Sequence, residues 1–91
     1  MEKIAFFISG TGGNALNLLQ ACREGRVPGE PVLAICSNPK ALGIERLRAQ
    51  GLPVSVRVRK DFPDDAVFSE ACLEAVEASG ARVICLCGWL K

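Results

Sequence analysis

Histidine and tyrosine are absent from this chain of 91 residues, and aromatic residues make up only 5% of it. Without histidine, the chain lacks the most common general acid or base and the most common metal ligand. Eleven basic residues nearly balance ten acidic ones, and the net charge of +1 argues against a protein that binds nucleic acid or anionic membranes through bulk charge. We therefore expect no nucleic-acid partner and no metal ion.

Long apolar runs are also missing. No run approaches the ~20 residues of a membrane-spanning helix, and only the apolar residues 4–8 separate Lys3 from Ser9, too few for a signal peptide. The five cysteines are odd in number, contain no CxxC pair and lie in apolar surroundings, including Cys85-x-Cys87. We interpret them as buried thiols of a reducing compartment rather than as a metal or redox centre, and we expect a cytoplasmic protein without membrane attachment.

What is present is a globular composition, with 49% hydrophobic residues and a mean hydropathy of +0.25. The length allows one small domain at most. Apolar periodicity predicts four strands, at 3–9, 31–36, 53–58 and 82–87, and three helices between them. This βαβαβαβ order predicts an α/β, Rossmann-like parallel sheet in three layers, with the first two helices on one face and the third on the other.

Several local features follow from the same periodicity. The second helix, 41–50, is expected to bury Leu42, Ile44 and Leu47, and Pro63 is expected in the first turn of the third helix. The alternating strand 53–58 is expected at an edge of the sheet. The strand 82–87 would be an uncovered apolar edge, so we expect residues 1–91 to be the front part of a larger domain, or a partner or second copy to cover that edge.

The most informative segment is the turn Ile8-Ser-Gly-Thr-Gly-Gly-Asn-Ala15, which joins the first strand to the first helix. Open α/β sheets bind ligands at this edge. Glycine lets an anion approach the main chain, and the helix that follows offers unpaired N–H groups and a partial positive charge. We predict phosphate binding here, the alternative being a turn with only a folding role. Asn14 is suited either to cap the helix or to contact the ligand.

Residues alone leave the kind of phosphate ligand open. Residues 10–15 fit the dinucleotide pattern GxGxxG/A, yet the end of the second strand reads Cys36-Ser-Asn38 and has no acidic residue to hold an NAD ribose. Ser37, Asn38 and Lys40 could surround the extra phosphate of NADP, which makes the cofactor half of an oxidoreductase one alternative. A P-loop is excluded because no Lys-Ser/Thr follows the glycines.

Three segments carry a family resemblance: Ile8-Ser-Gly-Thr-Gly-Gly-Asn14, Cys36-Ser-Asn38 with Ala41-x-Gly43-Ile-Glu-Arg46, and Leu86-Cys-Gly-Trp-Leu-Lys91. In order and spacing they resemble the opening half of the phosphoribosylglycinamide formyltransferase family. The resemblance implies a Rossmann-like domain of a purine-biosynthetic enzyme. Such an enzyme transfers a formyl group from 10-formyltetrahydrofolate to 5′-phosphoribosylglycinamide.

The resemblance also implies two sets of binding residues. Contacts to the ribotide substrate fall on Gly12, Gly13 and Asn14. Contacts to the folate fall on Trp89, Leu90 and Lys91. Family members commonly have Ser at position 13 and a Phe-Met-Arg type sequence at 89–91, so aromatic, apolar and cationic character is kept at the second site. The alternative for the aromatic residue of that site is a core or dimer contact.

Other family features are missing. The family's catalytic Asn, His and Asp fall beyond residue 91, so no catalytic residue is assigned and we predict that these residues alone are inactive. Asp65 stands where some relatives have a folate-contacting Arg. Arg57, Arg59 and Lys60 either reach an anion such as the folate tail or form a solvated strand edge and turn. A third hypothesis is a non-catalytic phosphate-binding module that pairs through its fourth strand.

Overall fold

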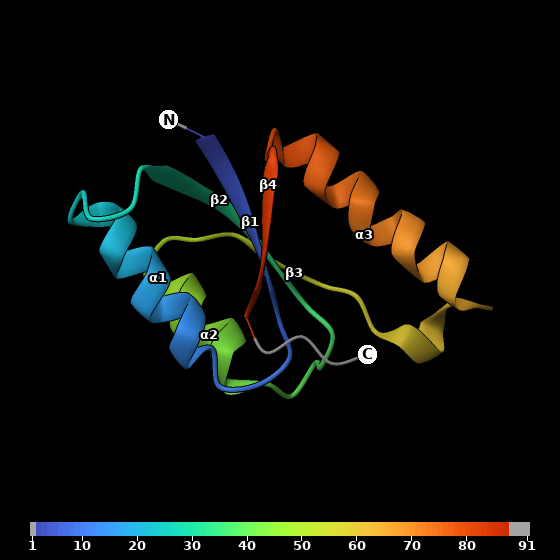
Figure 1. Ribbon diagram of the computed structural model, residues 1–91. Helices are drawn as coiled ribbons and strands as arrows, with labels where there is room; N and C mark the ends of the chain where they lie inside the picture. Colours follow the sequence, from blue (N-terminus) through green and yellow to red (C-terminus); the bar gives the residue numbers. More distant parts are fainter. Residues whose placement is uncertain (1, 88–91) are drawn as a thin grey trace.

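The computed structural model describes residues 2–87 (Figure 1). Parallel strands form one sheet in the order β3-β2-β1-β4. The strands are β1 (Glu2–Ile8), β2 (Gly29–Cys36), β3 (Val54–Val56) and β4 (Val83–Cys87). The helices between them are α1 (Gly13–Arg23), α2 (Leu42–Ala49) and α3 (Asp65–Ser79), with a short 3-10 turn, η1 (Arg59–Asp61), before α3. The predicted α/β, Rossmann-like topology is confirmed.

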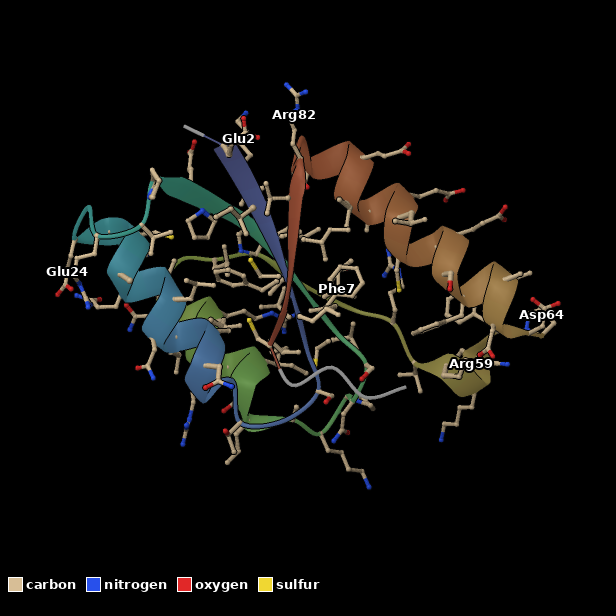
Figure 2. All side chains as sticks on the ribbon, viewed as in Figure 1. Glu2, Phe7, Glu24, Arg59, Asp64 and Arg82 are labelled. Atoms are coloured by element: carbon tan, nitrogen blue, oxygen red, sulfur yellow. The ribbon has the colours of Figure 1, made fainter. Side chains whose placement is uncertain are left out.

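The helices cover the two faces of the sheet as predicted. Figure 1 shows α1 and α2 on one side and α3 on the other. The side chains of β1 alternate between these two layers, because successive residues of a strand point to opposite faces. Phe6 and Ile8 join the core under α1 and α2, whereas Ala5 and Phe7 join the core under α3. Figure 2 shows Phe7 on the α3 side of the sheet. Burial on both faces explains the continuous apolar run of β1.

Three local predictions are wrong. Leu42 is 57% exposed rather than buried, because it is the first residue of α2 and lies on the side away from the sheet, while Ile44 and Leu47 are buried as expected. The third strand covers only Val54–Val56, because its neighbour β2 ends at Cys36, the partner of Val56, and leaves nothing further to pair with.

The third wrong prediction concerns the start of α3. Pro63 lies before this helix rather than in its first turn. Asp64 is the residue that caps α3, and its side-chain oxygen accepts a hydrogen bond from the Val67 amide at 2.9 Å. A capping carboxylate accepts a hydrogen bond from an otherwise unpaired amide and interacts favourably with the positive helix end. The first residue of the helix is therefore Asp65, directly after the capping Asp64.

Strand β4 is an edge of the described sheet, and its apolar side chains are exposed, as predicted. Leu86 is 69% exposed and Ile84 is 41% exposed, and both line an apolar groove of about 290 Å³ between β4 and α3. The prediction that residues 1–91 form only the front portion of a domain is not tested by this observation. Among the described residues, no helix has the length and apolarity needed to cross a membrane.

Candidate phosphate-binding loop at the end of strand β1

The turn between β1 and α1, residues 9–12, is shaped by a left-handed glycine. Gly12 is the N-cap residue of α1 and has a φ of 76°, a conformation that L side chains rarely adopt. Its carbonyl accepts the hydrogen bond from the Leu16 amide at 2.8 Å. Within residues 2–87 no side chain caps α1 and no acidic residue lies in its first turn. The capping role considered for Asn14 is therefore wrong.

Several main-chain amides of this turn point to no acceptor. Within the described part of the chain, the N–H groups of Thr11, Gly12 and Gly13 make no hydrogen bond. The first amides of a helix have no partner inside the helix, and together they carry its partial positive charge. The turn therefore presents a set of unpaired donors of the kind that binds anions.

These residues line a cleft at the carboxyl edge of the sheet. The cleft has a volume of about 280 Å³ and is lined by residues 10–14, from the turn and the start of α1, and by Cys87 at the end of β4. Successive strands are added from β1 to β2 to β3 in one direction across the sheet, and the chain then returns to add β4 on the other side of β1. The strand order therefore reverses between β1 and β4. Open α/β sheets bind ligands at this reversal. The structure thus brings the predicted Gly12, Gly13 and Asn14 together in one cleft.

Electrostatics around the cleft favour an anion. The guanidinium of Arg46, on α2, lies 3.5 Å from the Thr11 carbonyl oxygen, and no acidic side chain lines the cleft within residues 2–87. Burial raises the pKa of the Cys87 thiol, and the nearby Cys85 raises it further. Cys87 is therefore a neutral thiol near neutral pH and does not repel an anion.

Asn38, one of the residues of the NADP alternative, is held in a local turn after β2. The Asn38 side-chain oxygen accepts a hydrogen bond from the Lys40 amide at 3.0 Å, and the Cys36 thiol donates to the Asn38 carbonyl at 3.2 Å. This Asx-type turn holds the Asn38 side chain by itself. Lys40 takes part in this turn only through its main-chain amide.

The basic segment after β3 lies away from this cleft, beside the start of α3. The Arg59 guanidinium forms an ion pair with the Asp65 carboxylate at 2.5 Å and also donates to the Phe62 carbonyl. Figure 2 shows Arg59 near the beginning of α3, close to Asp64. Asp65, at the position of the charge reversal, thus neutralises a neighbouring arginine. The Arg57 guanidinium contacts the adjacent Val56 carbonyl at 3.3 Å.

All five cysteines are free thiols. Cys85 and Cys87 pack on the same side of the sheet, against the core under α1 and α2, as their spacing predicts. No group of three potential metal ligands occurs within residues 2–87. The predicted folate-binding residues Trp89, Leu90 and Lys91 lie outside the described residues.

Comparison with known proteins identifies the family. A family model described as "Formyl transferase" matches residues 2–91. The chain belongs to the formyl transferase family. Phosphoribosylglycinamide formyltransferase of Haemophilus influenzae is 30% identical over 91 residues, which are 100% of this chain and 43% of that protein. The trifunctional purine biosynthetic protein adenosine-3 of Drosophila melanogaster is 32% identical in an alignment 92 residues long, which covers 99% of this chain and 7% of that protein.

Solved structures show the same relationship. Glycinamide ribonucleotide transformylase 1 of Symbiobacterium toebii superposes with a TM-score of 0.95 at 34% identity, covering 100% of this chain and 43% of that one. The corresponding protein of Geobacillus kaustophilus gives a TM-score of 0.94 at 31% identity and is covered to 48%. This formyl transferase chain therefore spans less than half the length of these relatives. It corresponds to the N-terminal part of their domain.

Three residues near the cleft of this formyl transferase chain were not predicted from the sequence. Cys87 lines the cleft, a position that follows once β4 is known to pair with β1. Gly43 and Arg46 contact the turn from α2. The segment Ala41-x-Gly43-Ile-Glu-Arg46 contributes to the family resemblance, but nothing in its spacing indicates that it packs against the glycine-rich turn.

Proposed function

We propose that this chain provides the ribotide-binding part of a phosphoribosylglycinamide formyltransferase of purine biosynthesis. One observation supports the site above all others. Thr11, Gly12 and Gly13, whose amides have no hydrogen-bond acceptor among the described residues, line one cleft with Asn14 at the start of α1. The names of the relatives indicate a ribotide substrate, and the phosphate is the part of such a substrate that main-chain amides at a helix start recognise best.

In this proposal the phosphate lies over the turn and accepts hydrogen bonds from the three amides. Gly12 and Gly13 have no side chain, so the phosphate can approach the main chain closely. The exposed Asn14 side chain, which makes no hydrogen bond within residues 2–87, contacts the ribotide at the rim of the cleft. Charge-assisted hydrogen bonds of this kind are about twice as strong as neutral ones.

The formyl transferase family in general implies a formyl-tetrahydrofolate co-substrate. We propose that this co-substrate is 10-formyltetrahydrofolate and that Trp89, Leu90 and Lys91 begin its pocket. Formyl transfer passes through a tetrahedral intermediate whose oxyanion needs a preorganised donor. The resemblance assigns that work to an Asn, a His and an Asp that have no counterpart within residues 1–91. We therefore propose that these residues alone bind the ribotide without turning it over, in the cytoplasm, where free cysteines persist.

Calorimetric titration tests this function directly. The chain is titrated with 5′-phosphoribosylglycinamide, with the same compound lacking its phosphate, and with NADPH. We expect binding of the phosphorylated compound only, since the loop recognises the phosphate. Equal binding of the compounds with and without phosphate would show that the turn does not recognise the phosphate. Preferential binding of NADPH would support the oxidoreductase alternative instead.

A chimera tests the catalytic part of the proposal. Residues 1–91 are joined to the segment of the Haemophilus influenzae relative that follows its matched region. We expect formyl transfer from 10-formyltetrahydrofolate by the chimera and none by residues 1–91 alone. A folded chimera that binds both substrates yet transfers no formyl group would contradict the proposed reaction.

A further inference from the structure

We infer that Gly43, at the start of α2, is a positioning residue that sets the direction of the amides in the phosphate-binding turn. The inference rests on the proposed function, because it assigns a partner to the same turn. Gly43 lies outside the cleft and is not among its lining residues. It acts through the Gly10 carbonyl, which accepts a hydrogen bond from the Gly43 amide at 3.1 Å.

The contact between the turn and α2 is too close for any side chain. A Cβ atom on Gly43 would lie 2.9 Å from the Gly10 carbonyl oxygen and 3.0 Å from the Cα of Gly12. The same Cβ would lie 2.9 Å from the Cδ1 atom of Ile8. Glycine at position 43 is therefore required for α2 to reach the main chain of the turn.

This hydrogen bond fixes the direction of a whole peptide unit. The described residues, 2–87, contain no cis peptide bond, and in a trans peptide the C=O and N–H groups point in opposite directions. When the Gly10 oxygen points at Gly43, the Thr11 N–H of the same peptide points away from α2. The Arg46 guanidinium, 3.5 Å from the Thr11 oxygen, favours the same direction for the next peptide and its Gly12 N–H.

The consequence is a turn whose donors are oriented before any ligand arrives. A flexible glycine-rich loop would lose conformational entropy when it binds, whereas a loop held in place avoids that loss. The three-residue spacing of Gly43 and Arg46 on one side of α2 places both contacts against consecutive carbonyls of the turn. Helix α2 thus supports the site without touching the ligand.

Gly43→Ala tests the inference, with Gly51→Ala as its matched control. Gly51 lies just beyond the same helix, and a Cβ there meets nothing within 4 Å. We expect G43A to weaken binding of 5′-phosphoribosylglycinamide about tenfold or more, and to shift the Thr11 and Gly12 amide resonances of the free chain. The phosphate-free riboside should lose little affinity, so the ratio of the two affinities falls. G51A should lower stability but leave this ratio and these resonances unchanged.

A double variant keeps the test informative if G43A does not fold. Ile8→Val removes the Cδ1 atom that the new methyl group would meet, while the clash with the Gly10 oxygen remains. We expect I8V/G43A to fold and still to bind the ribotide weakly, with I8V alone binding normally. Wild-type affinity in folded G43A or I8V/G43A would overturn the inference and leave the proposed function standing. Failure of the wild-type chain to bind the ribotide would instead overturn the proposed function, and the inference with it.

Discussion

A methyl group on Gly12 would lie 2.8 Å from the Cα of Gly43, so the two glycines hold the phosphate-binding turn and helix α2 in main-chain contact. Gly12 also has a φ of 76°. Two separate reasons therefore require glycine at position 12, backbone conformation and close approach. The site is built from main chain, and its accuracy depends on residues that have no side chain.

Gly12→Ala should lower the free energy of unfolding by about 3 kcal/mol or more, since strain at positive φ adds to the clash with Gly43. Gly25→Ala is the matched control. Gly25 has a φ of 79°, but a Cβ there meets nothing within 4 Å, so only the backbone strain of about 1–2 kcal/mol applies. Urea unfolding of the two variants measures the difference. Equal losses would show that the approach to Gly43 is not tight.

Ribotide binding should protect Cys87 from alkylation, because its side chain lines the same cleft as the turn. Iodoacetamide labelling at about pH 9, where thiolate forms despite the raised pKa, is followed by mass spectrometry of the peptides. We expect the labelling rate of Cys87 to fall severalfold at saturating ligand. Cys72, buried under α3 on the other face, is the internal control and should not respond. If the labelling rate of Cys87 is the same with and without saturating ligand, the ligand binds outside this cleft.

Stability should fall at alkaline pH because of buried thiols. Burial raises the pKa of Cys36, and the hydrogen bond to the Asn38 carbonyl does not reverse this. The folded state therefore favours the protonated thiol. Its contribution is complete below the unfolded cysteine pKa of about 8.5 and is lost as pH rises through the higher folded value.

Denaturant titrations from about pH 7 to about pH 10 measure this effect. Cys36→Ala should be less stable at neutral pH but should lose less stability on going to alkaline pH. Ile35→Val is the control, a buried truncation on the neighbouring residue of β2 that should lower stability equally at every pH. A Cys36→Ala profile parallel to that of the wild type would contradict the assignment.

Leu86→Lys should reduce binding of an apolar fluorescent dye without unfolding the chain. Leu86 is 69% exposed and lines the apolar groove between β4 and α3, so its replacement by lysine removes little buried apolar area. The expected change in unfolding free energy is within about 0.5 kcal/mol. Val67→Lys, on an exposed site of α3 outside the groove, should leave dye binding unchanged. Sedimentation of the same variants shows whether a second copy covers this edge, which stays a prediction.

The topology was predictable because the burial of each strand determines its pattern of apolar residues. The apolar run of β1 and the alternation before Arg57 separate a central strand from an edge strand, and the glycine-rich turn after Ile8 indicates the ligand edge. Element ends were less predictable because they depend on neighbours. Strand β3 stops where β2 offers no further partner, and Leu42 is exposed because a residue two positions before the buried Ile44 lies on the opposite side of α2.

The candidate site was predictable only where a local motif marks it. Gly12, Gly13 and Asn14 lie together in the cleft, as their spacing and the family resemblance predict. The support from Gly43 was not predictable, since it depends on how closely α2 approaches a turn far away in the sequence. The folate assignment to Trp89, Leu90 and Lys91 stays a prediction.

The most direct test of the account is a ¹⁵N-edited NMR titration of the chain with 5′-phosphoribosylglycinamide. The amide protons of Thr11, Gly12 and Gly13 have no acceptor within residues 2–87, so a bound phosphate should shift them downfield by more than other amides. The compound without its phosphate should leave them in place. A folded chain in which these three resonances stay unchanged at saturating ribotide would contradict the central claim.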